Sequence, residues 1–200
     1  MTKSTRRTWR LPVGLLALSF IPIAVGTFRL SELASGATVT TKNTRFFSSP
    51  IPVVVHIISV TVFAVLGAFQ FVPELRQLRR RWHRTAGRLV APFGIAAALS
   101  GLWMALFYDI VPADDALLTT FRLTAGVGMV VCLSLGVAAI RTRDIARHHA
   151  WMMRGYAIGL GAGSQAFTNL PWVLIAGKPK GVTYALLMGA GWVINLALAE

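Results

Sequence analysis

One stretch of the sequence limits the possible folds more than any other: a long apolar run followed directly by a cluster of arginines. The apolar part, residues 51–72, is 22 residues long and ends in IISVTVFAVLGAFQFV, and PELRQLRRRWHRTAGR follows it at residues 73–88. A helix needs about 20 residues to cross the ~30 Å hydrocarbon layer of a bilayer. Arginines beside such a run favour the cytoplasmic side. The stretch therefore predicts a transmembrane helix that ends at the cytoplasmic surface.

The composition of the whole chain also indicates a membrane protein. Hydrophobic residues make up 55% of the chain and charged residues 14%, whereas soluble domains average about 45–50% and about 25%. A net charge of +13 would suggest nucleic-acid binding in a soluble protein. Here the basic residues lie between apolar runs and no nucleic-acid-binding motif is present, so we predict no nucleic-acid partner.

Five further apolar runs have the length of a membrane span. Because lipid offers no hydrogen-bond partner to the backbone, such spans must be helices. The first run is longer than the usual apolar part of a signal peptide, about 7–15 residues, so we expect a retained span that is kinked at Pro22. The predicted fold is all-α and integral to the membrane, with a basic N-terminal segment (1–10) and one six-helix transmembrane domain (11–200). The predicted spans are residues 11–28, 51–72, 89–108, 117–140, 152–175 and 182–199. Residues 29–50 and the basic segments 74–88 and 141–154 are predicted loops, as is the short acidic segment with Asp109, Asp114 and Asp115.

The distribution of basic residues predicts the orientation. If the N-terminus is cytoplasmic, the inner segments 1–10, 74–88 and 141–154 hold fourteen of the twenty lysines and arginines. The positive-inside rule then places both termini in the cytoplasm. Arginine clusters at cytoplasmic helix ends also attract anionic lipid headgroups, so the bilayer itself is an expected partner.

Small residues recur at every fourth position in two of the predicted spans. Such rows let neighbouring transmembrane helices approach closely, so we expect helix packing there. A chain with a single cysteine forms no intrachain disulfide, and we interpret this cysteine as a packing residue. The two rows are Thr124, Gly128, Cys132 and Gly136, and Gly155, Gly159 and Gly163.

Polar residues from four predicted spans share one depth near the outer surface. Ionisable groups at membrane depth are costly and often functional. One hypothesis is a polar pocket, open to the outside, that binds a small molecule, a lipid or a partner protein. The other is a structural network in which Arg122 extends its charge towards water. The candidate pocket residues are His56, Trp103, Arg122, Gln165, Thr168 and Asn169.

A second polar layer is predicted near the cytoplasmic surface. Its first interpretation is a belt of salt bridges and lipid-headgroup contacts. The alternative is a membrane redox component that holds haem b or a metal on His83 with His148 or His149, because imidazole is a good ligand for zinc and copper. The layer comprises Gln70, Glu74, His83, Arg84, Arg88, His148, His149, Arg154, Asn195 and Glu200.

Catalytic motifs are not evident. The sequence contains no phosphate-binding loop, HExxH motif or Ser-His-Asp arrangement, and the histidine spacing matches no strong metal motif. We therefore predict no catalytic residues and no resident cofactor, with haem b as the alternative. A non-enzymatic function is favoured, and an enzyme would be a membrane oxidoreductase component.

Several segments together resemble one uncharacterised bacterial membrane family, domain of unknown function 2306. They are HIISVTVFAVLGAFQFVPELR, WHRTAGRLVAPFGIAAALSGLWM, FRLTAGVGM, AIRTRDIARHHAWMMRGYAIGLGAGSQ and GWVINLALAE. The resemblance implies a multi-pass fold in a bacterial plasma membrane and no established activity, so it transfers no catalytic residues. It also implies that six polar residues belong to the family pattern: His56, His83, Arg122, His148, Asn195 and Glu200.

Overall fold

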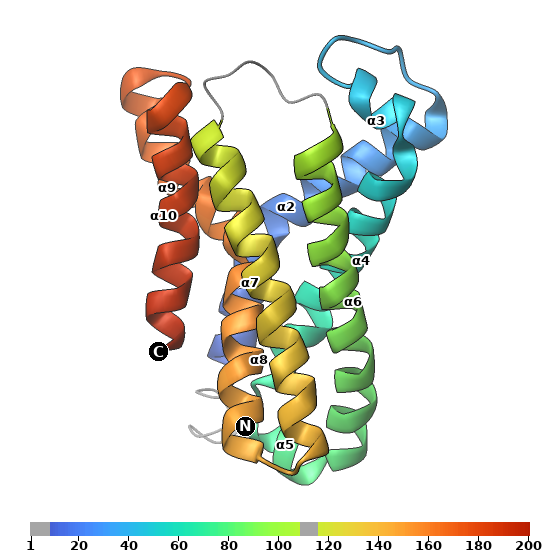
Figure 1. Cartoon of the computed structure of the whole chain (residues 1–200), viewed down its shortest axis with the longest axis vertical. Helices are drawn as coiled ribbons and strands as arrows, with labels where there is room; N and C mark the ends of the chain where they lie inside the picture. The colour runs from blue at the N-terminus through green and yellow to red at the C-terminus, as the bar shows by residue number, and fades with distance from the viewer. Residues whose placement is uncertain (1–8, 109–115) are drawn as a thin grey trace.

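The computed structural model describes residues 9–108 and 116–200, and within these ranges all regular secondary structure is helical (Figure 1). This confirms the predicted all-α class. Among the described residues, five helices are long and apolar enough to cross a membrane: α2, α4, α6, α7 and α10. The helices are α2 (Arg10–Ser35), α3 (Thr44–Ser48), α4 (Pro50–Gln70), α5 (Pro73–Leu78), α6 (Arg80–Phe107), α7 (Ala116–Arg141), α8 (Ile145–Gly159), α9 (Gly161–Ala176) and α10 (Gly181–Ala199).

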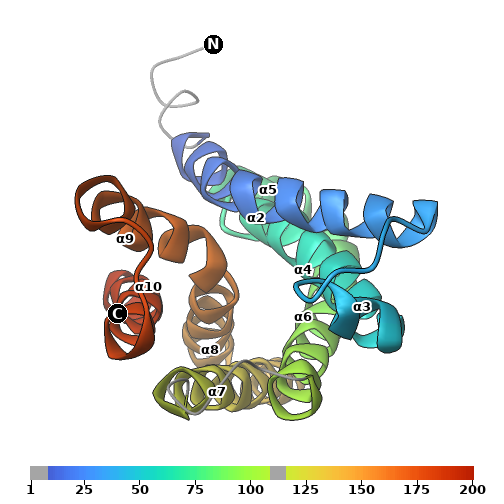
Figure 2. The ribbon, with the colours of Figure 1, turned by 90° about the horizontal axis from the view of Figure 1, so that it is seen from above.

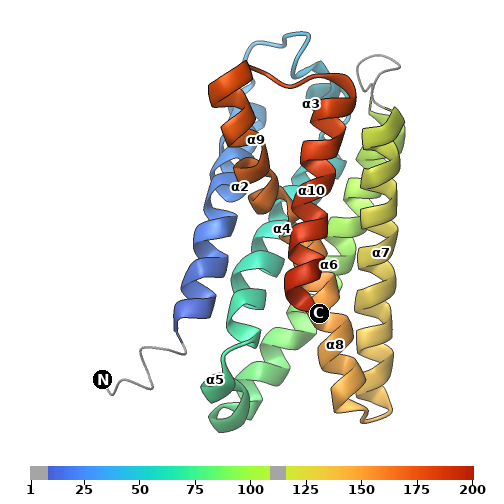
Figure 3. The ribbon, with the colours of Figure 1, turned by 90° about the vertical axis from the view of Figure 1, so that its left-hand side faces the viewer.

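The long helices run side by side and form a bundle with two distinct ends. The start of α2, the short helix α5, the turn between α7 and α8 and the end of α10 lie towards one end, here called the α5 end (Figures 1 and 3). Helix α3 lies at the opposite end, the α3 end. Seen from above, the outline of the bundle is formed by α2, α4, α6, α7, α10 and α9 (Figure 2). Helix α8 packs against α4, α6, α7, α9 and α10.

The first helix is longer than predicted. We expected a loop from Arg29, but α2 continues to Ser35 and contains Pro22 within it. The polar residues of this extension find partners inside the helix: Arg29 pairs with Glu32 at 2.6 Å, and the Ser31 hydroxyl donates to the Phe28 carbonyl. Gly36 then ends the helix in the left-handed conformation.

Both predicted basic loops are largely helical. Segment 74–88 contains most of α5 and the first turns of α6, and segment 141–154 contains the first turns of α8. The loop predictions were wrong because arginine, leucine and glutamine are good helix formers. Asp144 also caps α8, accepting from the Arg147 amide at 3.0 Å. The predicted acidic loop with Asp109, Asp114 and Asp115, and most of segment 1–10, lie outside the described residues.

The fifth predicted span, 152–175, is two helices rather than one. Helices α8 and α9 meet at Leu160, where the run of glycines has low helix propensity. A break at membrane depth must satisfy the backbone groups that it releases. The Ala157 carbonyl, four residues before the start of α9, accepts from the Asn195 side-chain amide at 3.0 Å. Ser164 at the start of α9 donates its hydroxyl hydrogen to the Asn195 carbonyl oxygen. One side chain of α10 therefore bridges the break.

In the core, neighbouring helices approach one another closely at glycine residues. Phe63 of α4 is fully buried, and its ring lies against Gly94 of α6 and Gly159 of α8, where any added Cβ atom would overlap it. The Tyr156 hydroxyl beside this ring donates to the Ala64 carbonyl at 2.8 Å. Helices α4, α6 and α8 thus meet on one aromatic side chain.

The two predicted rows of small residues face neighbouring side chains. Gly136 lies against Met152, and Gly155 lies against Leu133 and Cys132. Cys132 itself is buried in the core cluster. Helices α7 and α8 therefore pack through these rows, as expected for small residues between transmembrane helices.

A pair of valine substitutions tests this packing. Gly94→Val should lower the free energy of unfolding by about 1–3 kcal/mol relative to Gly14→Val, because overpacking a filled core costs about that much. A Cβ atom at Gly94 would overlap Phe63 and Leu133, whereas nothing lies within 4 Å of a Cβ atom at Gly14. Thermal unfolding of both variants in one detergent measures the difference, and equal stabilities would contradict the packing described here.

A candidate ligand-binding pocket

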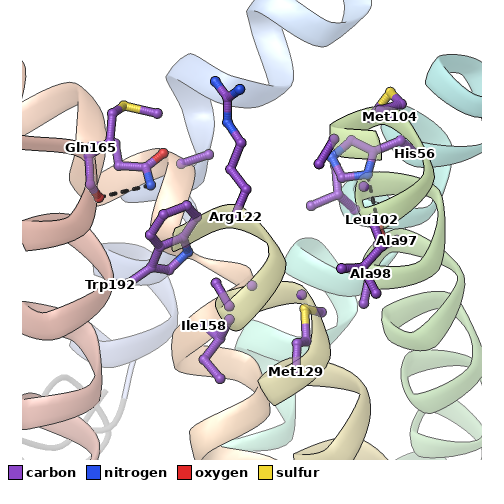
Figure 4. Close-up of a pocket in the computed structure, with 18 of the residues that line it drawn as sticks. His56, Ala97, Ala98, Leu102, Met104, Arg122, Met129, Ile158, Gln165 and Trp192 are labelled. Carbon is purple, nitrogen blue, oxygen red and sulfur yellow. Dashed lines mark hydrogen bonds between the residues drawn. The ribbon is translucent and has the colours of Figure 1, made fainter. Parts of the chain in front are cut away.

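A cavity of about 350 Å³ lies among the helices towards the α3 end (Figure 4). This volume falls at the lower end of the range for small-molecule sites, about 300–1,000 Å³. Most of the wall is apolar, with residues such as Leu102, Met129 and Ile158. The polar and charged groups of the wall come from the α3 segment and from four longer helices: Arg45, His56, Tyr108, Arg122 and Gln165.

His56 is held on the cavity wall by the backbone of α6. Its Nδ1 atom lies 2.9 Å from the Ala97 carbonyl oxygen and 3.3 Å from the Ser100 hydroxyl oxygen. Because a carbonyl oxygen only accepts, Nδ1 carries the hydrogen, and in the neutral ring Nε2 is left as an acceptor. A Cβ atom at Gly101 would lie 3.3 Å from the imidazole, so the glycine gives the ring room against α6.

Arg122 and Gln165 approach the cavity from other helices. The Arg122 side chain extends from α7 between the Trp192 wall and the His56 wall (Figure 4). It also makes an interaction elsewhere within the chain. Gln165 of α9 is buried, and its side-chain amide donates to the Met188 carbonyl at 3.1 Å. The cavity therefore combines hydrogen-bonding groups from three helices far apart in the sequence.

The other three predicted pocket residues do not line this cavity. Trp103 is 37% exposed, and its ring packs against those of Phe107 and Tyr108. Thr168 donates to the Leu187 carbonyl at 2.7 Å, which joins α9 to α10. The Asn169 side-chain amide donates to the Gln165 carbonyl at 2.8 Å within α9. The predicted outer layer thus divides into cavity residues (His56, Arg122 and Gln165) and helix-packing residues.

Among the cavity residues that the sequence analysis missed are Arg45, Phe46 and Tyr108. The guanidinium groups of Arg29 and Arg45 lie over the Phe46 ring, 4.5 Å and 4.8 Å from the ring centre. The Phe46 ring also meets the Tyr108 ring edge to face. An arginine beside two phenylalanines, next to an apolar span, is a signal for the membrane interface. Composition alone does not reveal that this segment folds back onto the bundle.

The predicted inner layer contributes contacts between α8 and α10. Arg154 holds the Glu200 carboxylate with two nitrogens, one of them at 2.8 Å. Asn195 bridges the break between α8 and α9. Arg88 is exposed. The Gln70 amide nitrogen is buried without a hydrogen-bond partner among the described residues. The side chain of Glu74 lies outside the description.

The three interfacial histidines have different environments. The Nδ1 atom of His83 is buried without a hydrogen-bond partner in the described ranges. His148 donates from Nδ1 to the Gly136 carbonyl at 2.8 Å, and the His149 ring packs edge-on against Phe71. Within residues 9–108 and 116–200, no group of three or more His, Cys, Asp or Glu side chains is arranged to hold a metal ion. The haem or metal hypothesis stays a prediction.

The Arg154–Glu200 pair predicts a pH dependence at the end of α10. The hydrogen bonds from Arg154 hold the pKa of the Glu200 carboxyl below its usual value of 4.5. A lowered pKa means that the pair stabilises the fold above about pH 4.5, and that this contribution is lost as the pH falls through the lower value.

Hydrogen exchange of residues 195–200 in lipid nanodiscs, followed from pH 7 to pH 3, measures this effect. Protection, which is the exchange rate relative to the intrinsic rate at the same pH, should fall at the acid end in the unmodified protein. Glu200→Gln should show the lower protection at every pH, with no acid step. An acid step that persists in Glu200→Gln would assign the effect to another group.

Comparison with known proteins identifies a family but no characterised relative. The chain matches the family model described as "Predicted membrane protein (DUF2306)" over residues 53–200. No curated protein matches the chain, and no solved structure matches it. The matched region begins in α4 and includes every helix from α5 onwards. The chain therefore belongs to the DUF2306 family of predicted membrane proteins.

Proposed function

We propose that the chain crosses a bacterial plasma membrane six times, with both termini in the cytoplasm. Five long apolar helices support five crossings, and α8 with α9 would supply the sixth, because the two continue in one direction along the bundle (Figure 3). The start of α2 and the end of α10 lie towards the α5 end. The arginines of segments 74–88 and 141–154 also gather at this end, which fits a cytoplasmic α5 end.

Reporter fusions test this topology. A green fluorescent protein joined after Glu200 should fluoresce, and alkaline phosphatase at the same position should be inactive, because the first folds in the cytoplasm and the second outside it. Alkaline phosphatase inserted between Gly36 and Lys42 should be active. An active phosphatase after Glu200 would contradict the proposed orientation.

We propose that the protein is a non-enzymatic binding protein that takes a small amphiphile or lipid into the cavity at the α3 end. The observation that carries this proposal is a mostly apolar cavity whose wall includes His56, Arg122 and Gln165. Apolar walls with a few placed polar groups are typical of small-molecule sites. A partner protein fits less well, because stable protein interfaces bury about 1,200–2,000 Å², far more than a cavity of this size offers.

Photo-crosslinking in nanodiscs tests whether the cavity is occupied. A diazirine-bearing long-chain alcohol and the corresponding fatty acid serve as probes, and peptide mapping locates the labels. At least one probe should label cavity peptides such as 101–105 and 125–129. Ala162→Phe should suppress that labelling, because Ala162 lines the cavity with an exposed side chain and a phenyl ring would fill the space.

The matched control is Ala197→Phe. Ala197 is also exposed, on α10, and it is not among the cavity residues, so its substitution should leave the labelling unchanged. Labelling confined to outward-facing peptides, with neither probe in the cavity, would overturn the proposed function.

A further inference from the structure

We infer that the cavity is selective for an anionic amphiphile, whose carboxylate or phosphate headgroup lies between Arg45 and Arg122 and whose chain follows the apolar wall. This inference rests on the proposed function and specifies the chemical class of the ligand. It depends on the charge of the cavity wall, on the state of Arg45 and on the distribution of apolar side chains.

The cavity wall carries positive charge without an acidic side chain. Arg45 and Arg122 both line it, and no Asp or Glu is among the described residues that do so. Two guanidinium groups that face one apolar cavity repel each other where water does not screen them. A bound anion would offset this repulsion, because it attracts both guanidinium groups.

Arg45 lacks an acceptor that an anion would supply. The neighbouring Arg29 has its own carboxylate partner in Glu32, but among the described residues no salt bridge includes Arg45. Its Nε atom is buried and has no hydrogen-bond partner in the described part of the chain. A buried donor without an acceptor costs free energy, which a carboxylate or phosphate oxygen would recover.

A contact with an aromatic ring positions Arg45 at the cavity wall. Its guanidinium lies over the Phe46 ring, 4.8 Å from the ring centre, and the Phe46 ring meets the Tyr108 ring edge to face. The Tyr108 hydroxyl is itself occupied, since it donates to the Ser49 carbonyl at 2.7 Å. The planar fork of an arginine held in this way suits bidentate binding of carboxylate or phosphate.

Arg122 provides the second charge from α7. Because it already has an interaction within the chain, a headgroup would share this guanidinium rather than occupy it alone. His56 adds an acceptor at Nε2, which can bind a hydroxyl hydrogen of a phosphate monoester or of a glycerol unit. The headgroup site therefore offers donors for anionic oxygens together with one acceptor.

The remainder of the cavity suits a hydrocarbon chain. The rest of the wall includes Met129, Ile158 and Trp192, together with small residues such as Ala98 and Gly126. These groups offer dispersion contacts and few hydrogen bonds. Charge at one side and apolar surface along the rest define an amphiphile with a single anionic end.

The test compares probes that share a chain and differ only in the headgroup. Diazirine-bearing fatty acid, alkyl phosphate and fatty alcohol are crosslinked to the protein in nanodiscs of zwitterionic phosphatidylcholine. Cavity labelling by the acid or the phosphate should exceed labelling by the alcohol about 10- to 100-fold, because a hydrogen bond to a charged group contributes about 1.5–3 kcal/mol. Comparison of the fatty acid with the alkyl phosphate shows whether the site prefers a carboxylate or a phosphate headgroup.

Substitutions assign the selectivity to the two arginines. Arg45→Gln and Arg122→Gln should each reduce the preference for the anionic probe, and Arg45→Lys should retain part of it. Arg88→Gln is the control, because Arg88 is exposed at the α5 end. A preference that survives both glutamine substitutions would overturn the assignment.

A measurement on the unmodified protein covers the case in which a glutamine variant does not fold. Preference for the fatty acid should disappear when the pH falls below the pKa of its own carboxyl group, whereas preference for a permanently charged alkyl sulfonate should persist. Equal cavity labelling by acid, phosphate and alcohol at neutral pH would overturn this inference and leave the proposed function standing. Absence of all three probes from the cavity would overturn the proposed function as well.

Discussion

The arrangement of this protein depends on one constraint: backbone and side-chain polar groups within a hydrocarbon layer must find partners inside the protein. Most helices meet it through their own hydrogen bonds. The break at Leu160 does not, and Asn195 of α10 supplies the missing partner to the Ala157 carbonyl. The same logic fixes His56, whose Nδ1 atom binds a carbonyl of α6. Polar residues in the bundle are therefore mostly structural, and those left with unused hydrogen-bonding capacity stand out as functional candidates.

The candidate site is also identified by asking which polar groups have hydrogen-bond partners within the protein. Thr168 donates to the Leu187 carbonyl and the Asn169 amide nitrogen donates to the Gln165 carbonyl. The Asn169 side-chain oxygen is buried without a partner in the described part of the chain, but neither residue lines the cavity. Arg45 retains a buried donor without an acceptor in the described part of the chain, and His56 retains Nε2. Both face one cavity together with Arg122. The contrast separates residues that hold helices together from residues available to a ligand, although all of them are polar groups near the α3 end.

Helical class and multi-pass character were predictable because apolar length and lipid burial determine them locally. Helix ends were less predictable. Helix α2 continues beyond its apolar run through a segment in which Arg29 pairs with Glu32, and segments rich in arginine form helices although their polarity suggests loops. The break at Leu160 depends on Asn195, 35 residues further along the chain. His56, Arg122 and Gln165 could be predicted as pocket residues from the sequence, because all three are polar and share one predicted depth. Arg45 was not, because only the folded chain shows that its segment returns to the cavity.

We propose that the bundle holds a mostly apolar cavity with a few polar groups, and that this cavity is reached from outside the cell. The most direct measurement is the reactivity of a single cysteine at Ala162, in a chain whose buried Cys132 has been replaced by alanine. A charged, membrane-impermeant thiol reagent added to intact cells should modify Ala162→Cys, and a fatty acid should protect it. Ala197→Cys, on the lipid side of α10, should stay unmodified. An Ala162→Cys variant that resists the reagent from outside, or that reacts only after the cytoplasm is opened, would contradict the account.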